Sequence, residues 1–192
     1  MDPAIEALIK HWQEKNILGF YCDSKDEVRG KILEIIPPSA SVGISGSVTL
    51  EELGIVGLLE TRGNMVFNQY KPGITPQENL ELRKKGAQEA DYYLASANAI
   101  SLSGELVFLS AYGNRTAGIA YAKNVIIVSG INKLTPDLDS ALKRAKEYAM
   151  SLNYRRLNWD TYRPMCCQVL IIEAEIMPQR LKVILVGENL GF

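Results

Sequence analysis

The stretch SVGISGSVTLEELG, residues 41–54, decides the fold class of this chain. Its first residues have the apolar pattern of a buried strand and its last residues have the spacing of an amphipathic helix, so it predicts a strand followed directly by a helix. The joint is rich in glycine and hydroxyl residues, which are Gly43, Ser45, Gly46, Ser47 and Thr49. A strand that leads into a helix is the building unit of α/β proteins.

Strands and helices alternate along most of the remaining chain. Apolar runs bounded by turn residues predict strands at 17–22, 64–70, 91–101, 104–112, 124–130, 167–176 and 181–192. Caps and helical spacing predict helices within 1–17, 24–38, 71–91, 113–122 and 137–153. This alternation favours a mainly parallel sheet with helices on both faces. The last two strands, joined by a turn that contains Pro178, are expected to form an added pair near the C-terminus.

Helix starts can be read from capping residues. Thr75 with Glu78 has the pattern of a capping box, and Thr49 with Glu52 has the same pattern at the start of the helix in the opening stretch. Gly54 and Gly57 fall inside the helix predicted for the opening stretch, and the expected role of both glycines is close packing on the sheet.

The composition is that of one globular domain. The chain has 192 residues, of which 47% are hydrophobic and 22% are charged, so we treat 1–192 as a single domain with a peripheral N-terminal helix over 1–17. The formal net charge of -1, without a long block of one sign, gives no reason to expect nucleic-acid binding. The sequence has no apolar run of the ~20 residues that cross a bilayer and no signal-peptide pattern, which favours a cytoplasmic protein without a membrane span.

The joint at residues 45–49 is a candidate ligand site, because ligands of open α/β sheets bind beyond the carboxyl ends of the strands. Gly43 and Gly46 would let the backbone approach a ligand closely. The amides of the helix start, with the hydroxyls of Ser45 and Ser47, would suit a phosphate or a carboxylate. The alternative is that this joint only turns the chain and caps a helix, since it matches neither a P-loop nor a complete dinucleotide fingerprint.

A second joint, SAYGNRTAG at residues 110–118, repeats this arrangement. It contains Gly113, Asn114 as the expected helix cap, and Arg115 with a guanidinium at the helix start. Two helix starts and one arginine favour an anion site more than either start alone. The alternative is an exposed arginine without a partner.

Four segments in a fixed order carry a family resemblance. They are VGISGSVTLEELGI (42–55), ADYYLASANAISLSGELVFLSAYGNRTAGIAYA (90–122), KNVIIVSGINKLTPDLDSALKRA (123–145) and VILVGENLGF (183–192). Together they resemble the LUD domain, the domain of the lactate-utilization proteins, from about residue 20 to the end of the chain.

The resemblance implies a fold similar to the sugar-phosphate isomerase and CoA-transferase (NagB/RpiA-like) group, whose members bind phosphosugars, acyl-CoA or folates. It also implies a link to the oxidation of lactate to pyruvate, in which family members accompany an iron–sulfur subunit. By position, the first glycine loop, the turn at 96–106, the loop at 113–115 and the strand end at 130–133 would line one cleft. Many relatives carry further cysteines where this chain retains only Cys166 and Cys167, so we assign no thiol or metal role.

Single residues suggest chemistry for this cleft. Asn98 can orient a substrate but has no titratable proton, whereas Glu105 is a candidate catalytic base or nucleophile, with a solvated turn residue as the alternative. Lys133 can bind an anion as a point charge beside Asn132, with a surface lysine as the alternative. His11 is the only histidine and is expected to be structural, which disfavours a histidine base or metal site.

We therefore favour a LUD-domain protein whose cleft binds a small anionic metabolite, as an accessory or binding subunit in lactate or 2-hydroxy-acid oxidation. Its candidate protein partners are an iron–sulfur oxidoreductase subunit and a second copy of the chain. No cofactor is identified, and whether the chain is an enzyme stays open. The alternatives are a free-standing sugar-phosphate isomerase or acyl transferase that uses Glu105, and an assembly module with a vestigial cleft.

Overall fold

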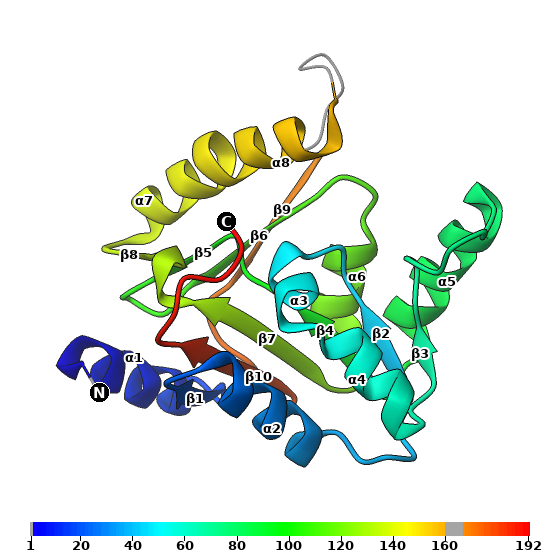
Figure 1. Cartoon of the computed structure of the whole chain (residues 1–192). Coiled ribbons are helices and arrows are strands. Elements are labelled where there is room, and N and C mark those ends of the chain that lie inside the picture. The colour runs from blue at the N-terminus through cyan, green and yellow to red at the C-terminus, as the bar shows by residue number, and fades with distance from the viewer. Residues whose placement is uncertain (1, 160–166) are drawn as a thin grey trace.

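Two β-sheets with helices packed around them make up the structure, a computed structural model that describes residues 2–159 and 167–192 (Figure 1). The larger sheet has six strands in the order β1-β10-β7-β4-β2-β3, and all neighbouring strands are parallel. Its strands are β1 (Leu18–Cys22), β2 (Val42–Ile44), β3 (Val66–Phe67), β4 (Tyr92–Ala95), β7 (Val125–Gly130) and β10 (Leu181–Val186). The predicted mainly parallel sheet is confirmed.

Helices cover both faces of this sheet, as predicted. One face is covered by α2 (Lys25–Ile35), α3 (Val48–Leu53) and α4 (Ile55–Arg62). The other face is covered by α1 (Pro3–Glu14), α5 (Pro76–Gln88) and α6 (Asn114–Tyr121). Along β7, Ile127 belongs to the core on the α1 side and Ile126 to the core on the α2 side. Successive residues of a strand point to opposite faces, so a strand that is apolar throughout needs cover on both sides.

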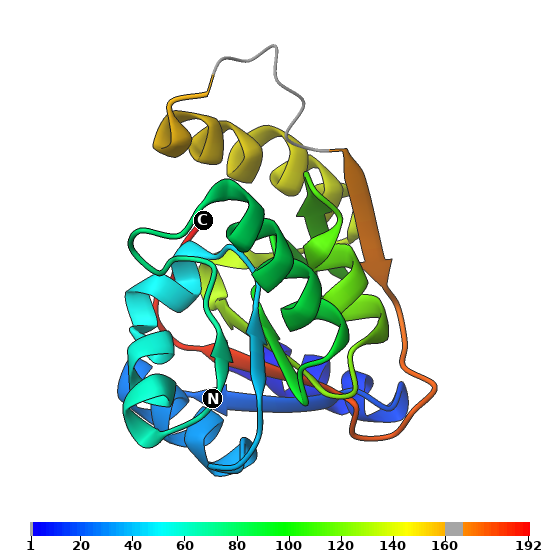
Figure 2. The same cartoon turned by 90° about the vertical axis from the view of Figure 1, so that its right-hand side faces the viewer.

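The smaller sheet supports a long helix. Its strands lie in the order β8-β5-β6-β9 and span Leu134–Thr135 (β8), Ala99–Ser101 (β5), Leu106–Ser110 (β6) and Gln168–Ile172 (β9). A short 3₁₀ turn, Ile131–Lys133, leads into β8. The helix consists of α7 (Leu138–Lys143), a π-helical segment (Arg144–Ala149) and α8 (Met150–Leu157). It packs on this sheet through Ala141 and Ala145 and runs across one end of the molecule (Figures 1 and 2).

Two strand predictions were wrong. The segment 91–101 forms two strands, because the chain leaves the main sheet after Ala95 and enters the smaller sheet at Ala99. The last two strands are not a pair: β9 lies antiparallel to β6 at the edge of the smaller sheet, whereas β10 is inserted between β1 and β7. Nearly every residue of β10 is buried, which requires cover on both faces and is met only inside the main sheet.

The helix caps were predicted with mixed success. The capping box of Thr75 and Glu78 is confirmed. The cap of α3 is Ser47 rather than Thr49, because the Ser47 hydroxyl accepts a hydrogen bond from the amide of Leu50 at 3.3 Å. Gly54 does not lie inside a helix; with φ of +60° it separates α3 from α4. No atom lies within 4 Å of a Cβ built on Gly54 or Gly57, so their predicted role in close packing was also wrong.

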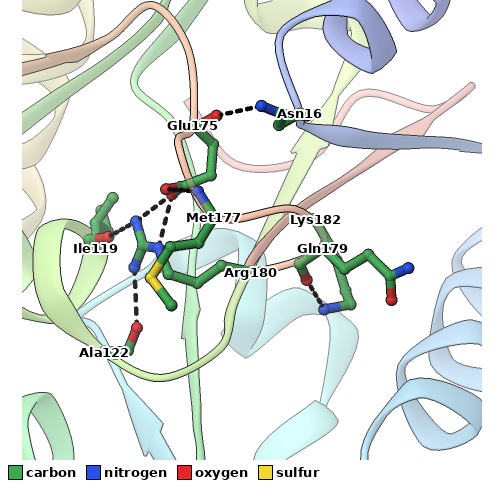
Figure 3. A network of polar contacts seen from close by, with 8 residues as sticks. All are labelled: Asn16, Ile119, Ala122, Glu175, Met177, Gln179, Arg180 and Lys182. Atoms are coloured by element: carbon green, nitrogen blue, oxygen red, sulfur yellow. Dashed lines mark hydrogen bonds and ion pairs between the residues drawn. The ribbon is translucent and has the colours of Figure 1, made fainter.

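The connection between β9 and β10 is held by a buried ion pair (Figure 3). Arg180 Nε donates to the Glu175 carboxylate at 2.6 Å, and the two side chains are only 10% and 7% exposed. Arg180 also donates to the carbonyl oxygens of Ile119 and Ala122 at 3.2 and 2.9 Å. Asn16 donates to the backbone carbonyl of Glu175 at 2.9 Å. This network ties the connection to α6 and to the chain that precedes β1, which positions the entry of β10 into the sheet.

None of the helices in the two described ranges has the length and apolar composition needed to cross a membrane.

Candidate functional site

A cavity of about 290 Å³ opens at the carboxyl ends of β2, β4 and β7. The loop after β2, the segment after β4, the turn after β7, the start of α6 and the helix over 138–157 surround it. Residues predicted for the site that line this cavity are Gly46, Ser47, Thr49, Asn98, Asn114, Arg115 and Lys133. Separate joints of the chain therefore meet at one edge of the sheet, which is where α/β folds bind ligands.

Lys133 is a buried lysine in the wall of this cavity. It is the last residue of the 3₁₀ turn after β7, and it is only 2% exposed. Its Nζ donates hydrogen bonds to Thr49 Oγ1 and Ser96 Oγ, both at 2.9 Å, and both acceptors line the cavity. No carboxylate hydrogen-bonds to Nζ anywhere in the described part of the chain, so the amine has only neutral partners. The alternative of a surface lysine is therefore wrong.

The pKa of Lys133 is lowered to about 7, mainly by burial and also by the positive charges of Arg144 and Arg115, whereas Glu52 acts in the opposite direction. A lysine in water has a pKa of about 10.4. The protonated amine is disfavoured here because the interior solvates a charge poorly and the two charges with the largest effect on it, those of Arg144 and Arg115, have the same sign.

Arg115 is held in place by neutral oxygen atoms. Its Nη1 donates to the carbonyl oxygen of Leu109 at 2.8 Å and to Asn98 Oδ1 at 3.3 Å. Its Nη2 donates to the carbonyl oxygen of Gly46, so the guanidinium joins α6 to the loop after β2. Burial lowers the pKa of Arg115. The alternative of an exposed arginine without a partner is wrong, and the guanidinium carries a positive charge into the wall of the cavity.

The wall of the cavity is basic. Four basic residues line it, namely Arg83, Arg115, Lys133 and Arg156. Among the lining residues that the structure describes, none is an aspartate or a glutamate. Hydroxyl and amide side chains, such as those of Ser47 and Asn153, complete the polar part of the wall. A negatively charged ligand would balance this excess of positive charge.

Gly43 and Ser45 do not line this cavity. Gly43 is buried where β2 crosses α5, and a Cβ built on it would lie 2.6 Å from the carbonyl carbon of Gly86, so it serves close packing rather than ligand approach. The Ser45 side chain is buried and lines a different pocket with Asn68 and Tyr70. Its hydroxyl has no hydrogen-bond partner in the described ranges.

Gly113 and Asn132 have structural roles beside the cavity. Gly113, with φ of +84°, precedes the first residue of α6, so the predicted cap at Asn114 was wrong by one position. The Asn132 side chain donates to the carbonyl oxygen of Gly191 and accepts from the amide of Leu190, both at 3.1 Å. These bonds hold the C-terminal segment, which brings Phe192 to the cavity.

Glu105 lies outside the cavity, so its predicted catalytic role is not supported. Its carboxylate accepts hydrogen bonds from the hydroxyls of Ser101 and Ser103 within the turn between β5 and β6. Burial alone would raise the pKa of Glu105, but these bonds outweigh it and the pKa lies below its usual value. A carboxylate with a lowered pKa is a weak base. His11 is part of the same region, where its ring faces the backbone of Gly104.

Several cavity residues were missed by sequence reasoning. Ser96 directly follows β4, but the apolar run at 91–101 hides that strand end. Arg83 and Arg156 lie on helices and Tyr70 lies on a loop, and no local pattern marks any of the three as facing a ligand. A shorter predicted strand would have revealed Ser96, whereas the other three depend on how distant elements pack. Cys166, whose role was left open, lies outside the described residues.

We expect Lys133→Met to raise the free energy of unfolding by about 1 kcal/mol or more at about pH 6, since apolar replacement of a buried charge is often stabilising. The folded pKa of about 7 lies below the unfolded value of about 10.4. In the wild type, the loss of stability caused by the buried charged amine is therefore complete below about pH 7, and it disappears as the pH rises to about 10. Arg115, Arg144 and Glu52 are the charged groups that act on the amine, and all are retained.

Denaturant unfolding of wild type and variant at about pH 6 and about pH 10 measures this difference, which we expect to shrink at the higher pH. Lys143→Met, at an exposed position on α7, is the matched control. An equal difference at both pH values would contradict the buried, destabilised charge.

Fold and cavity together define an α/β domain with a basic cavity at the carboxyl ends of its parallel strands. The family model of the LUD domain matches residues 5–186, and the chain belongs to that family. The match begins before the expected start near residue 20 and includes most of α1. No curated protein matches the sequence.

A solved structure with little sequence identity shows the same fold, and two others resemble it in part. A DUF162 family protein from Deinococcus radiodurans superposes with a TM-score of 0.58 over 96% of both chains, at 13% sequence identity. Ribose 5-phosphate isomerase from Plasmodium falciparum has a TM-score of 0.36 at 17% identity, over 58% of this chain and 52% of that one. The delta subunit of eIF2B from Chaetomium thermophilum has a TM-score of 0.33 at 16% identity, over 73% and 54%. The first likeness concerns the fold alone, and the two partial ones carry no argument about function.

Proposed function

We propose that the cavity binds a small anionic metabolite and that the protein is a binding or accessory subunit in the oxidation of lactate or another 2-hydroxy acid. One observation carries this proposal: Lys133 and Arg115 face the same cavity, and their hydrogen-bond acceptors are neutral oxygen atoms. A buried charge without a counterion is costly. A carboxylate or phosphate group would supply the missing negative charge.

The 2-hydroxy-acid part of the proposal rests on membership of the LUD domain family, together with the resemblance to lactate-utilization proteins. Lactate offers a carboxylate for the basic wall and a hydroxyl for the Ser96 and Thr49 hydroxyl groups. Oxidation of such a substrate releases electrons, and an iron–sulfur subunit is the partner that would accept them. Under this proposal the present chain supplies the binding site.

This function is preferred to an isomerase or an acyl transferase for a chemical reason. Both alternatives use a carboxylate as base or nucleophile, and the candidate, Glu105, hydrogen-bonds to two serines away from the cavity. An assembly module with a vestigial cleft would have no need of a buried lysine beside two hydroxyl groups. No specific observation favours either alternative.

We expect lactate, pyruvate and inorganic phosphate to raise the thermal unfolding midpoint, because a ligand that binds only the folded state stabilises it. Calorimetric titration should show that Lys133→Met weakens the affinity by about tenfold to a hundredfold, the value of one hydrogen bond to a charged group. Glycerol has hydroxyl groups but no charge, and it should produce no shift.

Lys143→Met is again the control and should bind like wild type, since Lys143 is exposed on α7 and does not line the cavity. The absence of a shift with every anion, including millimolar phosphate, would refute the anion site.

A further inference from the structure

Lys133 Nζ makes two hydrogen bonds, the number that a neutral amine can donate. A neutral amine has two N–H groups and one lone pair, whereas the ammonium form has three N–H donors. Nζ donates to two acceptors, Thr49 Oγ1 and Ser96 Oγ. No third acceptor for Nζ is present within 2–159 and 167–192. The third position on the nitrogen therefore has no hydrogen-bond acceptor in these ranges, and in the neutral amine it holds the lone pair.

The two hydroxyl groups are oriented to accept from the lysine. Thr49 Oγ1 donates its own proton to the carbonyl oxygen of Leu190 at 3.3 Å. Ser96 Oγ has the carbonyl oxygen of Ala97 at 3.3 Å and Thr49 Oγ1 at 3.1 Å as acceptors. Each hydroxyl can therefore use its proton elsewhere and offer a lone pair to Nζ. This arrangement fits an amine that donates two N–H groups and keeps its lone pair.

The rest of the wall suits a carbonyl compound that also carries a carboxylate. Arg115 and Arg156 line the same cavity and supply positive charge for the carboxylate. Ser96 and Thr49 lie beside Nζ and can exchange protons with a carbonyl oxygen that is under attack. A desolvated lysine amine is a nucleophile toward carbonyl groups.

We propose that Lys133 forms a reversible imine with a 2-oxo acid bound in this cavity. The inference rests on the proposed function, in which the cavity binds a small anion, and adds a covalent step and a substrate class. A 2-oxo acid is the oxidised form of a 2-hydroxy acid, so the same pocket would hold both partners of the redox pair and bond covalently only to the oxidised one.

The covalent step is balanced without an oxidant or reductant. The Nζ lone pair attacks the carbonyl carbon to form a C–N bond, and the carbonyl π electrons move to oxygen, which takes up a proton and becomes a carbinolamine hydroxyl. This hydroxyl then takes up a proton and leaves as water while the C=N bond forms. The amine loses both of its N–H protons, and they depart with the carbonyl oxygen as water. The lowered pKa of Lys133 supports this step, because a neutral amine is present near neutral pH.

Borohydride trapping tests the proposal with the full chain and pyruvate as the probe. Reduction fixes the imine as a secondary amine, so the intact protein should gain the mass of pyruvic acid less one oxygen atom. Peptide mapping should place this adduct on Lys133. Lactate has no ketone and should give no adduct under the same conditions.

Two variants separate a specific site from general lysine reactivity. Lys133→Arg keeps the positive charge but has no nucleophilic amine, so the adduct should disappear. Lys182→Arg should leave it unchanged; burial lowers the pKa of Lys182 as well, but this residue does not line the cavity. An adduct that persists in Lys133→Arg, or that maps to Lys182, overturns the proposal.

Calorimetry on the same samples tests the imine and the anion site separately. Pyruvate that binds wild type without forming an adduct refutes the imine and leaves the anion site intact. Pyruvate, lactate and phosphate that all fail to bind refute the anion site itself.

Discussion

Gly43→Ala is expected to lower the free energy of unfolding by about 3 kcal/mol or more, the upper end of the cost of overpacking a core. A Cβ at this position would lie 2.6 Å from the carbonyl carbon and 2.9 Å from the Cα of Gly86, and closer still to the Gly86 carbonyl oxygen. These are backbone atoms of α5, so relief requires the whole helix to move away from β2. Such a shift would also disturb Arg83, which α5 brings to the cavity.

Gly57→Ala is the matched control for this prediction. Gly57 is an exposed residue inside α4, and no atom lies within 4 Å of a Cβ built on it. We expect this change to stabilise the protein by about 0.4–1 kcal/mol, because alanine has fewer unfolded conformations than glycine. Urea unfolding of both variants measures the contrast. A Gly43→Ala variant as stable as wild type would show that β2 and α5 do not cross in close contact.

Arg180→Ala is expected to cost about 3–5 kcal/mol of stability, the typical effect of removing one partner of a buried ion pair. The change would leave the Glu175 carboxylate buried beside the empty space, and it would remove the hydrogen bonds to the carbonyl oxygens of Ile119 and Ala122 (Figure 3). The network holds the chain that leads into β10, so the variant should also loosen the main sheet around β10. Chemical unfolding gives the free energy, and amide exchange in β10 gives the local effect.

The pH dependence of this loss has a defined sign. Burial acts to raise the pKa of Glu175, but the hydrogen bond and charge of Arg180, together with the backbone amides of Met177 and Ile176, outweigh it and keep the pKa below its usual value. This carboxylate therefore stabilises the fold above the unfolded pKa of about 4.3, and the contribution is lost as the pH falls through the folded pKa. The difference between wild type and Arg180→Ala should shrink in acid, because a protonated Glu175 is no longer an unpaired charge.

Lys84→Ala is the control for the ion pair. Lys84 and Glu81 are 3.3 Å apart on the surface of α5, with side chains that are 56% and 45% exposed. An exposed pair of this kind contributes less than about 1 kcal/mol. Equal losses from Arg180→Ala and Lys84→Ala would show that burial of the first pair has no energetic consequence.

Part of the site was predictable because residues that follow the strands of a parallel sheet lie together at its carboxyl edge. Lys133 follows a strand that is apolar throughout, and Gly46 follows another, so both had to lie at the carboxyl edge of a parallel sheet. Arg83 and Arg156 could not be found in this way, because they lie on helices and the face that a helix turns to its neighbours depends on packing. Arg156 reaches the cavity only because its helix packs on the smaller sheet.

The order of apolar and polar residues by itself determined a mainly parallel α/β sheet with helices on both faces, since such periodicity is local and each buried strand needs two covered sides. The tertiary structure alone decided that β9 and β10 enter different sheets, because either strand pattern is compatible with several neighbours. It alone also decided the chemistry of Lys133. The pKa of that amine depends on its burial and on the charges of Arg115 and Arg144. Tertiary packing brings these groups together, and no local sequence pattern encodes their contacts.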